Sequence, residues 1–338
     1  MPVLDTSLLI ENRVQAVREF QQAANLGRAQ IDISGGVDSA TVGALLVLAL
    51  GADNVTAVFS GIHSSPMARN LAHRQAEALG LKLIDDDLTR EFDNRLRRMK
   101  NALKSAGYDL ETIEARIAED PTVLGSFRST LRAPLGRAYN RLTGDGLRYG
   151  TGNECEDRFL RFYQKGGDGE VDCNPLAMLS KGEVYQLAFA LGVIPEVLQA
   201  APTPDLWNGL SHTDEAELKK LTGVAWTYSR VSEGRYLHVG SIERVSRWLD
   251  TVGDALFDDR RSVEELASGR WYGPVENHNA FAGLSNLGVR KLLDSAKKIE
   301  RATRHKANPN CPSLGTRDEL AAQGILTNTL PVLLKDAA

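Results

Sequence analysis

A glycine turn between an apolar segment and a helical pattern is the feature that most constrains this fold. The turn reads Ser34-Gly35-Gly36-Val37-Asp38-Ser39; residues 29–33 before it are mostly apolar, and residues 40–49 after it have helical character. A helix that starts directly after a strand leaves backbone N–H groups unpaired and directed at an anion. The glycines permit positive φ and close approach of the backbone to phosphate. We call residues 34–39 the glycine loop and expect it to bind phosphate.

The glycine loop differs from the common nucleotide-binding loop G-x-x-x-x-G-K-[ST], because no lysine follows its glycines. It resembles instead the S-G-G-x-D-S loop of the ATP pyrophosphatase superfamily, which holds the pyrophosphate leaving group during adenylylation. Its serine hydroxyls can donate hydrogen bonds, and Asp38 can hold a metal ion that bridges phosphate oxygens. The structural alternative is an ordinary strand–turn–helix with a Ser or Asp cap.

Composition narrows the class of protein. The 338 residues are 42% hydrophobic and 25% charged with a net charge of −4, which is typical of a soluble globular protein and gives no case for nucleic-acid binding. The three cysteines are far apart, which argues against a zinc site or disulfide framework and fits a reducing cytoplasm. No signal peptide is evident, and the longest apolar run, residues 42–50, is too short to span a bilayer. We therefore expect a cytoplasmic protein with no membrane or nucleic-acid partner.

Strand and helix patterns alternate along the first two thirds of the chain. Strands are expected at 29–33, 54–59, 81–84 and 147–150, and helices at 8–26, 40–49, 67–79, 90–106, 128–142, 181–191, 242–256 and 287–304. We expect an acidic turn at 85–87, irregular or weakly helical structure at 107–126, and a helix start or kink at Pro134. The alternation predicts an α/β fold, a doubly wound parallel sheet flanked by helices, with an extra mainly helical or irregular C-terminal segment. The glycine loop then lies at the C-terminal ends of the strands, where ligands bind.

A second set of motifs follows the strand predicted at 147–150. These are Gly-Thr-Gly-Asn-Glu-Cys-Glu at 150–156, Lys-Gly-Gly-Asp-Gly at 165–169, Leu-Ser-Lys at 179–181, Ala-Pro-Thr-Pro-Asp-Leu at 201–206, Thr-Asp-Glu at 213–215 and Thr-Arg-His-Lys at 303–306. In this order, downstream of the glycine loop, they resemble the NAD synthetase family over residues 10–220 and 288–310.

This resemblance implies a homodimeric enzyme that uses ATP, Mg²⁺ and a nitrogen source to convert deamido-NAD (nicotinic acid adenine dinucleotide) to NAD, AMP and pyrophosphate. A carboxylate is a poor electrophile because hydroxide is a bad leaving group. ATP turns it into an acyl-adenylate, which ammonia can attack. The protein must hold the carboxylate against the α-phosphorus and spread the charge of pyrophosphate.

The resemblance also carries over residue roles. Ser34, Gly36, Asp38 and Ser39, with Gly35 and Val37 between them, match the phosphate loop, and Asp38 and Glu156 match Mg²⁺ ligands. Lys181 matches a lysine on ATP phosphate, and Thr151 and Asn153 a turn near the nucleotide. Lys165, Asp168 and Asp172 match residues around the dinucleotide. Asp205 matches the aspartate of the family's P-[ST]-A-D-L turn, and His305 and Lys306 match a tail pair that closes over the phosphates. We expect Asp38, Lys181 and Asp172 to be catalytic.

Each residue also has a plain structural interpretation. The glycine-rich turn at 165–169 is typical of a protein surface, and Asp205 suits a helix cap. Lys181 fits a solvated first-turn lysine, and Glu156 fits a surface acid beside Glu154 and Asp157. Cys155 and Cys173 lie beside the expected site and suggest sulfur transfer, but free cysteine is usually a small buried hydrophobe.

The resemblance to the NAD synthetase family also suggests how the chain is divided into domains. We expect an NAD synthetase-like domain at 1–229, an atypical insertion or lid at 230–286, and a C-terminal helix and tail at 287–338 that complete the first domain. Only about thirty residues precede the glycine loop, so we expect no fused glutaminase domain; ammonia is used directly or delivered by a separate glutaminase. The alternatives are a ligase for a related acid such as nicotinic acid mononucleotide, a thiolation enzyme, and a non-catalytic nucleotide-binding homologue.

Overall fold

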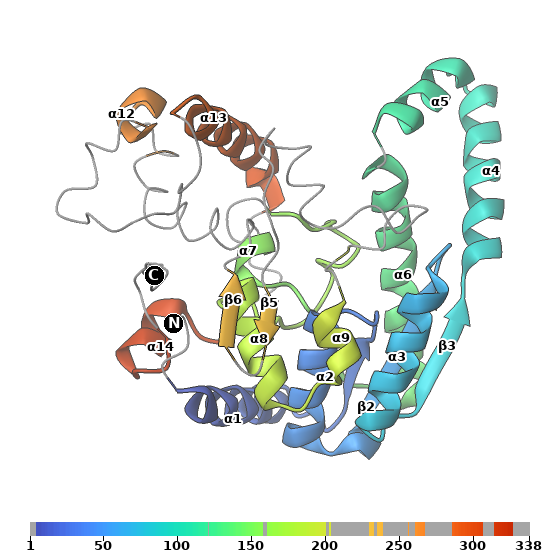
Figure 1. Cartoon of the computed structure of the whole chain (residues 1–338). Coiled ribbons are helices and arrows are strands. Elements are labelled where there is room, and N and C mark those ends of the chain that lie inside the picture. Colours follow the sequence, from blue (N-terminus) through green and yellow to red (C-terminus); the bar gives the residue numbers. More distant parts are fainter. Residues whose placement is uncertain are drawn as a thin grey trace.

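The computed structural model describes residues 5–120, 122–157, 161–200, 203, 230–232, 235–238, 256, 261–267, 286–306 and 314–326. Its centre is a four-stranded parallel sheet in the order β3-β2-β1-β4 (Figure 1). The strands are β1 (Ala29–Asp32), β2 (Val55–Gly61), β3 (Leu83–Asp87) and β4 (Leu147–Tyr149). The predicted doubly wound parallel sheet is therefore confirmed.

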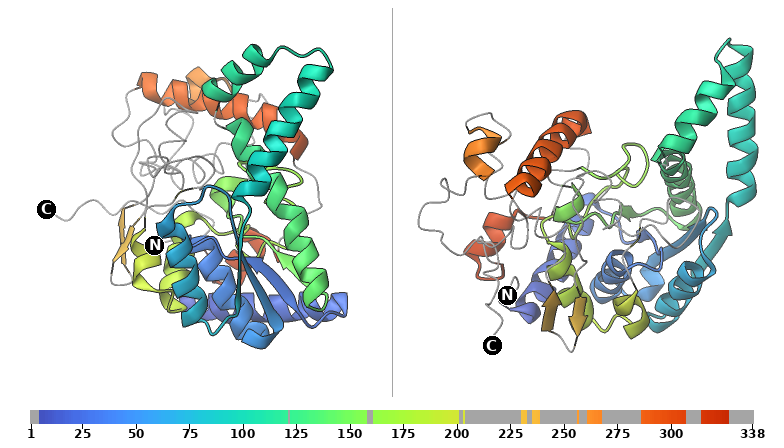
Figure 2. Two further views of the ribbon diagram at one scale, coloured as in Figure 1. Left: turned by 90° about the vertical axis from the view of Figure 1, so that its right-hand side faces the viewer. Right: turned by 45° about the horizontal axis from the view of Figure 1, so that its top comes forward.

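Helices cover both faces of the sheet (Figure 2). The helices of the first two thirds are α1 (Thr6–Ala24), α2 (Val37–Leu50), η1 (Ala52–Asn54), α3 (Pro66–Ala78), α4 (Thr89–Ser105), α5 (Leu110–Glu119), α6 (Thr122–Thr143), α7 (Glu154–Asp157), α8 (Lys181–Ala190) and α9 (Pro195–Gln199). Because the chain steps from β1 to β2 to β3 in one direction, right-handed crossovers place α2 and α3 on one face. The return to β4 places α6 on the other face, against β1, β2 and β4.

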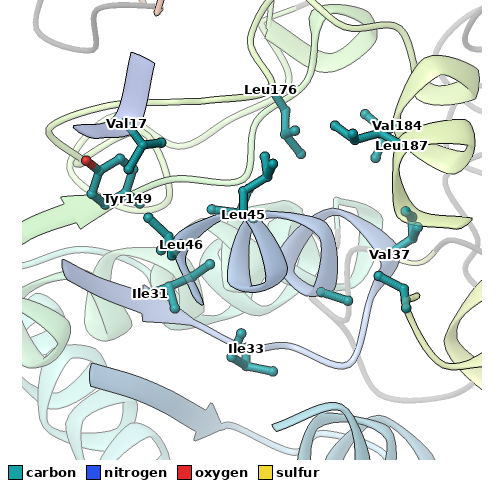
Figure 3. Packing of buried hydrophobic residues seen from close by; sticks show 14 of the residues in the cluster. Val17, Ile31, Ile33, Val37, Leu45, Leu46, Tyr149, Leu176, Val184 and Leu187 are labelled. Atoms are coloured by element: carbon teal, nitrogen blue, oxygen red, sulfur yellow. The ribbon is translucent and has the colours of Figure 1, made fainter. Parts of the chain in front are cut away.

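The main core lies between the sheet, α1, α2 and α8 (Figure 3). Residues 37–46 of α2 are nearly all buried, as expected for a helix that is apolar on every side. Leu45 and Leu46 are fully buried, and each contributes about 1.5–3 kcal/mol of transfer free energy. The start of α2, and with it the glycine loop, is therefore held in the most buried layer of the protein.

One local expectation was wrong, and two others can be compared with the structure. Residues 85–87 belong to β3 rather than to a turn, because tertiary partners satisfy their carboxylates. Asp85 accepts hydrogen bonds from Arg69 Nε at 2.8 Å and His73 Nε2 at 2.6 Å, and Asp86 accepts one from Tyr139 Oη at 2.7 Å. Pro134 lies inside α6, which begins at Thr122, so this proline does not start the helix. The segment 107–126, expected to be irregular or weakly helical, contains α5 and the first turn of α6, so it is mostly helical.

The later part of the chain adds further elements. They are an antiparallel hairpin of β5 (Arg230–Ser232) and β6 (Arg235–His238), α12 (Val263–Ala267), α13 (Asn286–Thr303), η4 (Arg304–Lys306) and α14 (Arg317–Ala322). The hairpin packs beside α8 and was not predicted from the sequence. The helix expected at 242–256 lies, apart from Leu256, outside the described residues. Among the described helices, none is both long and apolar enough to cross a membrane.

Substituting Gly35 tests the fit of the glycine loop against α3. Gly35 has φ +85°, and a Cβ there would lie 2.4 Å from the carbonyl oxygen of Ala68. We expect Gly35→Ala to lower the free energy of unfolding by roughly 2–4 kcal/mol, from left-handed strain and overpacking together. Urea denaturation followed by circular dichroism measures this. The control is Gly27→Ala, because a Cβ at Gly27 meets nothing within 4 Å; equal losses in both variants would contradict the prediction.

Candidate active site

The glycine loop is organised by its own serines. Ser34 and Ser39 share a hydrogen bond between their hydroxyl oxygens at 3.0 Å, and Ser39 Oγ also accepts the backbone N–H of Ser34 at 3.1 Å. Gly36 is the N-cap residue of α2. Val37 is 4% exposed and packs in the core below α8 (Figure 3). The loop therefore presents the amino end of α2, with its partial positive charge, in a fixed shape.

A buried ammonium group joins three elements next to this loop. Lys181 Nζ lies 2.6 Å from Asp38 Oδ2 and 3.0 Å from Glu156 Oε1. Asn153 Nδ2 donates to the other carboxylate oxygen of Asp38 at 3.2 Å. The Lys181 side chain is 5% exposed, so it is a buried, paired lysine rather than a solvated one. Asp38, Asn153, Glu156 and Lys181, all singled out from the sequence, are thus brought together.

Local structure fixes each of these side chains. Lys181 is the first residue of α8, and Ser180 before it forms a capping box with Glu183. Glu156 lies on α7, and its backbone N–H donates to the carbonyl oxygen of Asn153 at 3.2 Å. Thr151 is half-buried in the turn that leads from β4 to Asn153. The geometry follows from helix starts and a strand end rather than from a flexible loop.

The carboxylates of Asp38 and Glu156 fit a hard cation. They already converge on one positive group, the ammonium of Lys181, which shows that both oxygens can face a single charge. Among the described residues, no group of three or more His, Cys, Asp or Glu side chains is placed to hold a metal alone. Two carboxylates without a full protein cage suit Mg²⁺, which takes its remaining ligands from water and substrate phosphates.

The loop after α7 and the residues after α13 form a second part of the site. Asp168 accepts a hydrogen bond from Ser129 Oγ at 2.6 Å, which ties this loop to α6. Lys165 Nζ donates to the carbonyl oxygen of His305 at 3.4 Å, and Lys306 Nζ donates to that of Tyr163 at 2.5 Å. The tail pair thus lies against the glycine-rich turn, although the two segments are far apart in sequence.

Asp157 joins the two parts of the site and was missed as a functional candidate, because the sequence suggested only a surface acid. Burial raises the pKa of Asp157, and the nearby carboxylates of Glu156 and Asp168 raise it further, whereas Lys306 opposes the shift. Burial likewise lowers the pKa of Lys306. A Cβ on Gly152 would lie 2.0 Å from Asp157 Oδ2, so the second glycine of the motif makes room for this carboxylate. No local sequence signal marks this contact, which depends on the turn between β4 and α7.

Asp172 has a different setting from the other predicted catalytic residues. It accepts hydrogen bonds from Arg137 Nη1 at 2.6 Å and from the backbone N–H of Arg148 at 2.7 Å. Among the described residues these contacts tie Asp172 to α6 and β4, not to Lys181 or Asp38. Cys173 is a fully buried thiol, as its structural interpretation predicted. Asp205 lies outside the described residues.

Known proteins are similar to this chain over about its first two thirds. The family model described as NAD synthase matches residues 9–224. Among the similar curated proteins, the NH(3)-dependent NAD(+) synthetase of Halobacterium salinarum (strain ATCC 29341 / DSM 671 / R1) is 35% identical over 209 residues, which are 61% of this chain and 71% of that protein. The protein of the same name from Alkaliphilus oremlandii is 32% identical over 212 residues, covering 62% and 79% of the two chains.

Solved structures share the fold. The NMN synthetase from Francisella tularensis superposes with a TM-score of 0.62 at 19% identity, over 90% of this chain and 96% of that chain. The NH3-dependent NAD synthetase from Campylobacter jejuni superposes with a TM-score of 0.56 at 19% identity, over 90% and 98%. From the match of the family model to residues 9–224 and the identities above 30%, the chain belongs to the NAD synthase family.

Proposed function

We propose that this protein is an ammonia-dependent NAD synthase, an ATP-dependent amide ligase that forms NAD, AMP and pyrophosphate from deamido-NAD. The observation that carries the proposal is the meeting of Asp38, Glu156 and Lys181 beside a preorganised glycine loop. Family relatives named NH(3)-dependent NAD(+) synthetase, at up to 35% identity, support the reaction.

Different residues of the site have different roles in adenylylation. The backbone N–H groups at the start of α2 and the hydroxyls of Ser34 and Ser39 bind the pyrophosphate part of ATP. Lys181 supplies a positive charge to the phosphates, next to the place where charge develops. Asp38 and Glu156 would hold Mg²⁺, which, when bound, neutralises phosphate charge and orients the leaving group. The buried setting makes each of these electrostatic interactions stronger than in water.

The second part of the site suits the dinucleotide substrate. We assign Lys165, Asp168 and Asp205 to deamido-NAD, and His305 and Lys306 to closing the site from the tail, with Thr151 and Asn153 near the nucleotide. The contact between Lys165 and the backbone of His305 supports a shared role for turn and tail. Asp172 pairs with Arg137 and accepts the backbone N–H of Arg148, and we propose that it acts by holding β4 in place.

Several broader expectations stay predictions. They are a homodimer, the use of ammonia directly or by delivery from a separate glutaminase, a cytoplasmic location, and the division into residues 1–229, 230–286 and 287–338. The hairpin β5–β6 packs on α8, so the proposed insertion begins beside the helix that carries Lys181.

Turnover with defined substrates tests the reaction. Purified protein incubated with ATP, Mg²⁺, ammonium and deamido-NAD should form NAD, AMP and pyrophosphate in equal amounts, because one adenylate is used per amide. Chromatography quantifies the three products. A parallel reaction with nicotinic acid mononucleotide identifies the preferred acid. Faster AMP formation with the mononucleotide would replace the proposed substrate, and no AMP with either acid would reject the ligase.

Removing the Asp38 carboxylate tests the site. We expect Asp38→Ala to lower kcat at least about 10²-fold, because both the metal ligand and the partner of Lys181 are lost. The fold should survive, since Lys181 keeps Glu156 as its partner. Steady-state kinetics and far-UV circular dichroism measure the two effects. Asp53→Ala is the control, because Asp53 is an exposed residue of η1; unchanged turnover in Asp38→Ala would overturn the metal assignment.

Lys181 and a metal ion should compete for the same two carboxylates. In Lys181→Met, Asp38 and Glu156 face each other without their ammonium, so we expect a lower Tm in metal-free buffer and a larger rise in Tm on adding Mg²⁺ than in the unmodified protein. Apparent Mg²⁺ affinity without nucleotide should increase about tenfold, equivalent to about 1.4 kcal/mol. Thermal shift across a Mg²⁺ titration measures this. The control is Lys82→Met at an exposed lysine; identical Mg²⁺ responses in all three proteins would contradict the competition.

A further inference from the structure

A buried arginine of the tail helix α14 reaches the two helices that carry the site. The side chain of Arg317 is 7% exposed. Its Nη2 lies 2.8 Å from Glu183 Oε1, and its Nη1 lies 3.1 Å from Glu183 Oε2 and 3.4 Å from Glu154 Oε2. Nη1 also donates to the carbonyl oxygen of Met178 at 3.1 Å. One guanidinium therefore serves two buried carboxylates and a backbone carbonyl.

Both carboxylates belong to structures that place catalytic groups. Glu183 Oε2 accepts the backbone N–H of Ser180 at 2.7 Å in the capping box of α8, and Lys181 is the next residue. Glu154 is the first residue of α7, and its backbone N–H donates to the carbonyl oxygen of Leu179 at 2.8 Å. Glu156 lies two residues further along α7. Arg317 therefore contacts one residue that lies two positions before Glu156 and another that lies two positions after Lys181.

The tail helix is firmly attached to the main body. Leu320, Ile325 and Leu326 are each 1% exposed and belong to the main core cluster. Asn12 Nδ2 of α1 donates to Gln323 Oε1 at 3.0 Å, and Arg13 Nη1 donates to the carbonyl oxygen of Leu314 at 2.5 Å. Figure 1 shows α14 beside α1, far in sequence from α7 and α8. It also lies outside residues 9–224, which the family model matches.

We propose that Arg317 is a positioning residue for the amide-forming reaction. Its positive charge offsets the negative charges of Glu154 and Glu183. Its two-pronged guanidinium contact holds the starts of α7 and α8 at the spacing at which Glu156 and Lys181 can form their ion pair. Without it, the carboxylates of Glu154 and Glu183 lose the guanidinium that bridges them, and the starts of α7 and α8 lose the contact that sets their spacing. A shift of α8 by a fraction of an ångström then misaligns Lys181 with the phosphates. This inference rests on the proposed function.

Three proteins test the role of Arg317. Arg317→Met removes the charge, Arg317→Lys keeps a charge but cannot form the two-pronged contact, and Leu320→Ala loosens the same helix through its core contact alone. Should Arg317→Met fail to fold, Arg317→Met with Glu154→Gln removes one of the stranded charges. The readouts are kcat, KM for deamido-NAD, Tm, and hydrogen–deuterium exchange of backbone amides.

We expect both Arg317 variants to lower kcat about tenfold or more, with KM for deamido-NAD changed less than about twofold, because alignment is lost and not substrate binding. Exchange should accelerate at residues 150–157 and 178–185. Leu320→Ala should lower Tm, with kcat retained and faster exchange confined to residues 314–326. Equal kcat loss and equal exchange in Leu320→Ala, or full activity and unchanged exchange in Arg317→Lys, would overturn the proposal.

Failure of the proposed function and failure of the positioning role give different results in these measurements. If the unmodified protein forms no NAD, the proposed function fails, and exchange at residues 150–157 and 178–185 still reports whether Arg317 holds α7 and α8. If the unmodified protein forms NAD while both Arg317 variants match it, only the positioning role is lost.

Discussion

The ion triad of a buried Lys181 with the half-buried Asp38 and Glu156 is the interaction on which the rest of the site depends. A single ammonium joins the first turns of α2 and α8 to α7. Taking these charges out of water is costly, and only close contacts of 2.6 and 3.0 Å offset the cost. The surrounding core makes such geometry possible, because α2 and α8 pack against each other and share one hydrophobic cluster that includes Val37, Val184 and Leu187. The triad in turn fixes three charged side chains directly beside the glycine loop.

Other buried charges hold the elements around that centre. Arg148 of β4 is 3% exposed; it pairs with Asp32 of β1 at 2.7 Å and donates to the carbonyl oxygen of Ala133 in α6 at 2.7 Å. Gly136 is needed there, because a Cβ would lie 3.0 Å from the Arg148 guanidinium. The sheet, α6 and the tail helix are therefore tied together by arginines whose partners come from distant parts of the chain. Breaking one such pair strands a buried charge, so each acts as a constraint on geometry as well as on stability.

Family membership bears on residues 9–224, whereas the role proposed for the later residues rests on their contacts. The matched region, residues 9–224, contains the glycine loop, Glu156 and Lys181, so the relatives bear on adenylylation. Lys306 and α14 lie beyond it, and only their contacts connect them to the site. Lys306 reaches the loop at Tyr163, and the tail helix reaches the capping box of α8. The later part of the chain therefore contributes two contacts to the site, one from Lys306 and one from Arg317 of α14.

The sequence by itself determined the parallel sheet, the glycine loop and the residue types of the centre. These signals are local: an apolar strand, a glycine turn and a helix start at fixed spacing specify an anion site wherever the chain goes next. Only the tertiary structure decided that Lys181 is buried and that it pairs with Asp38 and Glu156. The same holds for Arg317, which no motif marks. The physical reason is that burial and charge pairing are set by contacts between residues far apart in sequence, and a linear pattern carries no record of which distant groups meet.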